Sequence, residues 1–346
     1  MRQRAYAVTG ATAYLASAGT ALPGVPVDNA TLGKLLGVSE EWIDIFVGTR
    51  TRHFAWDLAT GEVHQSLTDL CAEAGDLAIA GAGLDPSDIE FLVLATATPD
   101  TLLPTTAARV ADRLGLNYLP AYQLQAGCSG AVQAIDLGRS LIAGGSGAGL
   151  VIGGDVTNRH LDVRRDLSRM PTEELVNYVL FGDGAGAAVL TAEPAGERVA
   201  LRGVLNRFAG LGRPPGQIID WYGTTDRHSE RQMISEDYKE IEESVPVMAV
   251  EILWDLLGLL DWKVEDLDFL LPPQLSTRMT QRIVEHMAVP GAREISCVSD
   301  TGNTGNALPF QQIERLLPEL GSGQRALAVA VESSKWIKTG LALEKA

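Results

Sequence analysis

Cys128 is the residue whose type and setting point most directly to chemistry. The sequence around it reads Ala-Gly-Cys-Ser-Gly at residues 126–130, after a predicted strand and before a predicted helix that starts at Val132. Backbone N–H groups and the positive end of the helix dipole would face the thiol in such a turn and favour its thiolate form. A thiolate attacks thioesters, and the resulting acyl-cysteine divides one acyl transfer into two easier steps. The Cys128 amide and a second backbone N–H would stabilise the oxyanion that forms.

Cys128 also has an ordinary explanation, because a small buried core position is the commoner place for a cysteine. From the turn and its flanks alone, both interpretations stand. The other two cysteines are assigned to the core, since Cys71 lies inside a helical stretch, residues 67–80, and Cys297 lies at the end of a predicted strand. None of the three has CxxC or metal-ligand spacing. We therefore expect reduced thiols, no metal and no cofactor.

Composition restricts the class of protein. The chain has 346 residues, of which 46% are hydrophobic, enough for one large core or two fused ones. Its 44 acidic residues outnumber 28 basic ones and give a net charge of −16, which argues against binding to nucleic acid or to an anionic membrane. No apolar run reaches the roughly 20 residues of a membrane helix. A soluble, cytoplasmic globular protein is expected.

The elements that must position Cys128 follow an α/β pattern that occurs twice. Apolar strand-like runs alternate with helix-period stretches, and the order strand, helix, strand, glycine-rich turn, helix recurs late in the chain. The first copy uses residues 85–98, 105–114 and 127–142, and the second uses residues 264–275, 277–287, a strand at 295–298, the turn 302–305 and a helix from Pro309. We infer a duplicated core with an N-terminal half, 1–190, and a C-terminal half, 191–346. Chance similarity between two α/β units is the alternative.

Several segments together resemble ketoacyl-ACP synthase III of the thiolase superfamily. Residues 126–145 are similar to that family's nucleophile segment, and Phe-Gly-Asp-Gly-Ala-Gly at 181–186 is similar to its central strand. Asn-Thr-Gly-Asn at 303–306 and Arg-Thr-Arg-His-Phe at 50–54 match further landmarks in the right order. The resemblance implies the five-layered α-β-α-β-α thiolase fold, a homodimer with sites near its interface, and an acyl thioester substrate.

Two of the family's three catalytic positions carry over. The family uses a cysteine, a histidine in Pro-His-Gln-Ala-Asn and an asparagine in Gly-Asn-Thr; Cys128 and Asn303 match, whereas Pro273 stands where the histidine should be. In condensing members the histidine and asparagine hydrogen-bond the thioester oxygen while malonyl loses carbon dioxide, which a proline side chain cannot do. Losing one such donor commonly costs about a hundredfold or more in rate. Decarboxylative condensation should therefore be badly impaired, while acyl loading onto Cys128 should survive.

An enzyme that loads an acyl group but makes a carbon nucleophile poorly is expected to use a nitrogen or oxygen nucleophile. A neutral amine needs the least help, whereas an alcohol needs a general base. His160 aligns beside the family's substrate tunnel and is the best candidate base, followed by His228. A solvated or structural role is expected for His53, His64 and His286.

The acyl donor is predicted from two further positions. Family members that use coenzyme A hold it with a tryptophan and an arginine; Trp42 is retained, but Phe46 replaces the arginine. Arg159 or Arg165 could match a second arginine near the adenine site. Because the tryptophan is retained but the arginine after it is lost, an acyl-carrier protein is favoured over an acyl-CoA as donor.

An acidic carrier protein needs a basic landing site. By resemblance Arg278 lies on the docking helix, and Arg282 follows one turn later on the same face. An ordinary solvated helix face is the alternative for both.

The pocket is expected to include residues that depart from the family. Leu103, before Pro104, would reach into the partner subunit's acyl pocket. Ser334 belongs to Glu-Ser-Ser-Lys-Trp at 332–336, which replaces a glycine-rich family loop near the nucleophile. The stretches 158–176 and 213–239 could cover the acceptor entrance, or they could be surface elaborations.

The resemblance, together with the lost histidine, thus implies an acyltransferase of secondary metabolism, of the type found in antibiotic biosynthesis. It would load an acyl group, such as an aromatic or polyketide one, from an acyl-carrier protein onto Cys128 and pass it to an amine or hydroxyl acceptor. One alternative is a decarboxylating 3-oxoacyl synthase that relies on Asn303 alone. Another is a catalytically silent partner subunit, although such a subunit has no need of a thiol.

Overall fold

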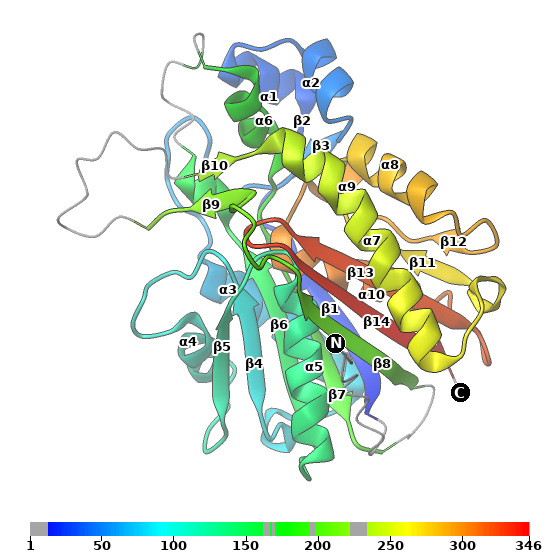
Figure 1. Ribbon diagram of the computed structural model, residues 1–346. Helices are drawn as coiled ribbons and strands as arrows, with labels where there is room; N and C mark the ends of the chain where they lie inside the picture. Colours follow the sequence, from blue (N-terminus) through cyan, green and yellow to red (C-terminus); the bar gives the residue numbers. More distant parts are fainter. Residues whose placement is uncertain (1–12, 162–166, 168–169, 194–197, 222–233, 346) are drawn as a thin grey trace.

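The computed structural model describes residues 13–161, 167, 170–193, 198–221 and 234–345. Its main feature is a ten-stranded sheet in the order β12-β11-β13-β14-β8-β1-β7-β6-β4-β5 (Figure 1). The strands from the first part of the chain are β1 (Tyr14–Ala21), β4 (Leu92–Thr96), β5 (Ala121–Gln125), β6 (Ala148–Asp155) and β7 (Gly184–Thr191). Those from the second part are β8 (Val199–Phe208), β11 (Phe269–Leu271), β12 (Arg293–Glu294), β13 (Arg325–Glu332) and β14 (Ile337–Lys345).

These two sets of five strands have the same topology. Numbered by their order along the chain within each set, both run third, second, fourth, fifth, first across the sheet. In each set the second strand is parallel to its two neighbours and the fifth strand is antiparallel to its two neighbours. The sets meet where β1 pairs with β8 at Tyr14 and Leu15. The core is therefore duplicated, while the predicted boundary after residue 190 stays a prediction.

Helices pack in three layers around the two sets of strands. The outer face of the first set is covered by α3 (Leu67–Ala82) and α4 (Thr106–Arg113). The outer face of the second set is covered by α7 (Tyr238–Leu260) and α8 (Thr277–Met287), which lie side by side in Figure 1. Between the sets, α5 (Gly130–Ala143) and α10 (Leu308–Leu316) share one hydrophobic cluster with strands of both. This is the predicted five-layered thiolase fold.

A smaller cluster of elements covers one end of these layers. It consists of helices and short two-stranded ribbons that pack on a hydrophobic cluster of their own. They are α1 (Asn29–Leu36), α2 (Glu40–Phe46), α6 (Thr172–Leu180), the ribbon β2 (Val27–Asp28) with β3 (Thr51–Arg52), and the ribbon β9 (Gln217–Ile219) with β10 (Ile234–Glu236). Figure 1 shows β9 and β10 beside α6 and the start of α7.

One predicted element is wrong. Residues 295–298 do not form a strand, because β12 ends at Glu294 and the four-residue helix α9 (Val298–Thr301) begins at Val298. The buried side chain of Gln274 explains the difference, since its Oε1 accepts hydrogen bonds from the backbone N–H groups of Cys297 and Val298, both at 2.8 Å. These bonds satisfy the two N–H groups away from the sheet ladder. Cys297 and Cys71 are both buried, as predicted for core residues.

Candidate active site

Cys128 lies in the tight turn between β5 and α5. The turn closes through the Gly130 N–H, which donates to the Gly127 carbonyl at 2.8 Å, and it leaves Cys128 half-buried. Gly130 is needed here because a Cβ at this position would lie 2.4 Å from Asn306 Oδ1. The sequence-predicted setting, a thiol before the first turn of a helix, is therefore present.

Asn303 is held by backbone hydrogen bonds to the end of α6 and the segment that joins it to β7. Its N–H donates to the Leu180 carbonyl at 3.0 Å, and its carbonyl accepts from the Gly182 N–H at 3.1 Å. The side-chain Oδ1 of Asn303 accepts from the Gly305 N–H at 3.0 Å. The amide nitrogen is consequently the end of this side chain that can donate to a ligand.

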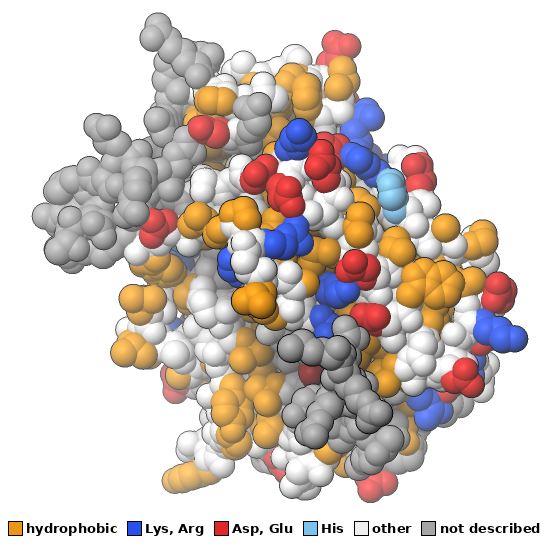
Figure 2. Space-filling view, viewed as in Figure 1, with side chains coloured by type: hydrophobic (Ala, Val, Ile, Leu, Met, Phe, Trp, Pro, Cys, Tyr) orange, Lys and Arg blue, Asp and Glu red, His pale blue; other side chains and the backbone are white. Residues whose placement is uncertain are grey.

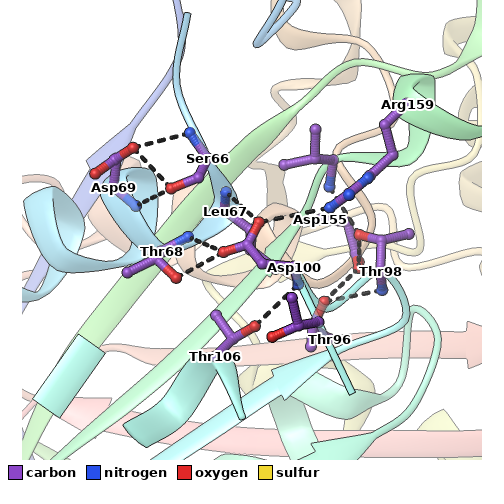
Figure 3. Close-up of polar contacts among 12 residues, drawn as sticks. Ser66, Leu67, Thr68, Asp69, Thr96, Thr98, Asp100, Thr106, Asp155 and Arg159 are labelled. Carbon is purple, nitrogen blue, oxygen red and sulfur yellow. Dashed lines mark hydrogen bonds and ion pairs between the residues drawn. The ribbon is translucent and has the colours of Figure 1, made fainter. Parts of the chain in front are cut away.

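A buried carboxylate ties the two turns together. Asp155, at the end of β6, accepts from the hydroxyls of Thr96 and Thr98, each at 3.0 Å, as Figure 3 shows. Its other oxygen accepts from the N–H and Nδ2 of Asn306 at 2.8 and 2.9 Å, and Asn306 Nδ2 also donates to the Ala126 carbonyl at 2.9 Å. Since Ala126 precedes the Cys128 turn and Asn306 follows Asn303, this network fixes their mutual position.

Cys128 and Asn303 line one cavity. Most of its wall is apolar, and its polar groups are few, which is usual for a small-molecule site. The other lining residues are Leu180, Phe181, Gln217, Glu236, Tyr238, Ile241, Glu242, Val245, Leu275, Ser276, Met279, Val331 and Ser333. A second cavity shares Cys128, Leu275 and Val331 with the first and includes Pro273. Proline thus stands beside Cys128 where the resemblance places a histidine.

The surroundings of Cys128 do not favour a thiolate, contrary to the sequence prediction. Burial raises the pKa of the Cys128 thiol to about 12, and the carboxylates of Glu332, Asp155 and Glu236 add to this effect. Negative charges near a thiol disfavour its ionised form. The helix dipole noted from the sequence is therefore opposed by three acidic groups that the fold brings close.

Glu332 is held against the nucleophile turn by two serines. The Ser129 hydroxyl donates to Glu332 Oε2 at 2.5 Å, and the Ser334 hydroxyl donates to Glu332 Oε1. Ser334, expected to bind substrate, thus directs its hydroxyl to Glu332, while its neighbour Ser333 lines the cavity. The role of Ser334 in substrate binding stays a prediction.

His160, the base expected from sequence, is not among the residues that line either cavity at Cys128. It lies in the 3₁₀ turn Thr157–His160, with its ring centroid 5.8 Å from that of Trp221. Burial lowers the pKa of His160 to about 4, which weakens it as a base. His228 and Arg165 lie outside the described residues.

Three further residues expected to bind substrate are Trp42, Arg159 and Leu103. Trp42 stacks on Phe46, with ring centroids 4.9 Å apart. Arg159 directs its guanidinium to Asp100 at 3.5 Å, and Asp100 also accepts hydrogen bonds at the start of α3 (Figure 3). Leu103 is 82% exposed. Its exposure is compatible with a contact to another chain, but a role in the partner's pocket stays a prediction.

The two arginines expected to dock a carrier protein lie on α8 and already have partners. Arg278 donates from Nε to the Asp44 carbonyl at 2.9 Å, and Arg282 pairs with Glu242 at 2.5 Å. Figure 2 shows basic and acidic side chains interleaved where α7 and α8 lie, rather than one basic patch. Docking through these arginines stays a prediction.

Two acidic residues at the site were missed by the sequence analysis. Glu236 lies on β10 in the polar stretch 213–239, and Glu332 ends β13. Their only signals were their place in segments that depart from the family pattern. In the described part of the chain, no group of His, Cys, Asp and Glu could hold a metal ion. No helix among those residues is both long and apolar enough to cross a bilayer.

Comparison with known proteins decides the family. A sequence model described as 3-oxoacyl-[acyl-carrier-protein (ACP)] synthase III matches residues 122–203. The beta-ketoacyl-[acyl-carrier-protein] synthase III of Rhizorhabdus wittichii is 34% identical over 296 residues, which cover 85% of this chain and 87% of that protein. The chain belongs to the synthase III family.

Solved structures also match over nearly the whole chain. AbyA1, named a tetronic acid condensing enzyme, is 54% identical with a TM-score of 0.94, over 96% of this chain and 100% of that one. The synthase III of Pseudomonas aeruginosa is 27% identical with a TM-score of 0.82, over 96% and 98% of the two chains. As a member of this family the chain is a transferase that works through an acyl-cysteine, and its structural neighbours are consistent with the antibiotic-biosynthesis type.

Proposed function

We propose that this synthase III transfers an acyl group from acyl-Cys128 to a hydroxyl, or to a carbon that is already acidic, without decarboxylation. The observation that carries this proposal is that Cys128 and Asn303 share a cavity while Pro273 stands beside Cys128. Proline cannot assist the loss of carbon dioxide from malonyl. The acceptor must therefore be a nucleophile that needs no decarboxylation.

The likeness to AbyA1 supports one class of product. A tetronic acid is a five-membered lactone that carries a 1,3-dicarbonyl unit, so its assembly needs one acyl–oxygen and one acyl–carbon bond. The carbon between two carbonyl groups in a 3-oxoacyl thioester is acidic already, and a base suffices to make it a nucleophile. We therefore propose a hydroxyacyl or 3-oxoacyl acceptor, and tetronic-acid-like ring formation as the overall reaction. An amine, the other acceptor predicted from sequence, is included in the experiment described below.

The proposed donor is an acyl-carrier protein and the proposed assembly is a homodimer. β5 is the last strand of the sheet, and Tyr122 on it is 42% exposed. Leu102 and Leu103, in the loop after β4, are 69% and 82% exposed. An edge strand beside exposed apolar side chains supports pairing with a second copy of the chain.

Intact-protein mass spectrometry tests the function. Wild type and Cys128→Ala would be incubated with acyl N-acetylcysteamine thioesters, and the adduct then exposed to a 2-hydroxyacyl thioester, a 3-oxoacyl thioester, a primary amine or a malonyl thioester. We expect an adduct on wild type alone that the hydroxyl or 3-oxo acceptor discharges. Discharge by the malonyl thioester alone would support decarboxylative condensation instead. The absence of any adduct would support a catalytically silent subunit.

A further inference from the structure

The proposed reaction needs a base, and the side chain of Pro273 cannot act as one. The titratable side chains that line the cavity are Cys128, Glu236, Tyr238 and Glu242, and no Lys, Arg or His among the described residues lines it. An attacking hydroxyl, or a carbon between two carbonyls, must lose a proton as it attacks. Among the described residues that line the cavity, these four groups are the candidates to receive that proton.

Three of the four groups are poorly suited to the task. Cys128 carries the acyl group and has no free sulfur at that stage. Tyr238 is protonated at neutral pH, because burial and the nearby carboxylates of Glu242 and Glu236 raise its pKa. Glu242 is 43% exposed and its carboxylate already pairs with Arg282 at 2.5 Å. Glu236 remains.

Glu236 is held in the cavity wall by a specific structure. It ends β10, where it pairs in register with Gln217 of β9, and Gln217 Nε2 donates to Glu236 Oε1. The next residue, Asp237, donates its N–H to the Gly216 carbonyl at 2.8 Å and caps α7 by accepting from the Glu240 N–H. The backbone on both sides of Glu236 is thus fixed, and its carboxylate is close enough to act electrostatically on Cys128.

We infer that Glu236 is a catalytic base that accepts the proton of the nucleophile attacking acyl-Cys128. As the O–H or C–H bond breaks, the proton passes to Glu236, the new acyl–oxygen or acyl–carbon bond forms, and the C–S bond breaks. The proton then passes from Glu236 to the departing sulfur, so thiol and carboxylate are both restored. This inference rests on the proposed function and adds the base that its reaction needs.

The acidities of the two groups suit this exchange. Burial raises the pKa of Glu236 to about 7, near the value at which a base is most effective at neutral pH. The thiol of Cys128, with a pKa of about 12, takes the proton back readily once the C–S bond breaks. The acidic surroundings that make Cys128 a poor thiolate thus favour the return of the proton.

Single-turnover discharge of hexanoyl-Cys128 separates this role from a structural one. The variant Glu236→Gln can keep the hydrogen bond to Gln217 but cannot accept a proton. Once hexanoyl N-acetylcysteamine thioester has fully acylated Cys128 in each protein, we expect discharge by a 2-hydroxyacyl thioester to be at least about 100-fold slower in the variant. Hydroxylamine, which needs no base, should discharge both proteins equally. Glu236→Asp should recover part of the rate.

The pH profile and a matched control complete the test. Discharge of wild type should rise with pH through about 7, as Glu236 ionises, and this rise should vanish in Glu236→Gln. Glu240→Gln changes a carboxylate four residues away that pairs with Arg213 at 2.7 Å and does not line the cavity, so it should behave as wild type.

Other outcomes would overturn the inference. Equal hydroxyl-dependent discharge by wild type and Glu236→Gln would exclude the role assigned to Glu236. Equal slowing of discharge by the hydroxyacyl thioester and by hydroxylamine would indicate a structural effect. If wild type itself is discharged by neither a hydroxyl nor a 3-oxo acceptor, the proposed function fails and the inference with it.

Discussion

Replacing Glu332 with glutamine should make Cys128 more reactive toward alkylating agents. The Glu332 side chain packs so closely on the nucleophile turn that a Cβ on Gly127 would lie 3.0 Å from its Cδ. After burial, its charge is the largest cause of the raised pKa of Cys128. Glutamine removes the charge, while its amide can still bond to the two serine hydroxyls.

The size of the effect follows from the charge. For any two unit charges about 6 Å apart, an effective dielectric constant of about 20 gives an interaction of about 3 kcal/mol, or about two pKa units. Because the hydroxyls of Ser129 and Ser334 already disperse the charge of Glu332, we expect the pKa of Cys128 to fall by about one to two units. The thiolate becomes less nucleophilic as its pKa falls, so alkylation at neutral pH should rise roughly 3- to 10-fold.

The measurement is the rate of iodoacetamide adduct formation, followed by intact mass between pH 6 and pH 10. Cys128→Ser should abolish the adduct, since Cys71 and Cys297 are buried. Glu319→Gln, which alters an exposed carboxylate paired with Arg293, controls for a change in net charge. An unchanged or slower rate in a folded Glu332→Gln protein would refute the electrostatic reasoning.

Three further predictions address the lost histidine, the nucleophile turn and a buried acid. Pro273→His should increase carbon dioxide release from malonyl thioester; an unchanged rate would mean that more than this side chain limits decarboxylation. Gly130→Ala, which forces a Cβ to 2.4 Å from Asn306, should lower the free energy of unfolding by about 1–3 kcal/mol in urea, whereas Gly258→Ala, with open space around it, should not. Burial raises the pKa of Asp183 to about 7, so the native state holds a proton that the unfolded state has lost, and stability should fall from pH 4 to pH 7. Asp183→Asn should flatten that decline; an equal slope in both proteins would contradict it.

The sequence by itself determined the fold class, the nucleophile and the departure from the family. The glycine-rich turns at Cys128 and Asn303 and the repeated order of elements are local patterns, and local patterns can be read without knowing which segments meet. Two copies of one strand order and a cavity shared by both turns agree with them. Proline at position 273 is likewise visible in the sequence, and its inability to hydrogen-bond does not depend on the fold.

Only the tertiary structure decided the electrostatics of the site. Glu332 and Glu236 reach Cys128 from β13 and β10, more than a hundred residues along the chain, so no local pattern could reveal that they raise its pKa. The same holds for His160, whose alignment suggested a base but whose position leaves it outside the cavity. The burial of a site and the charges around it come from segments that are distant in sequence. They are therefore set by how the two halves pack together.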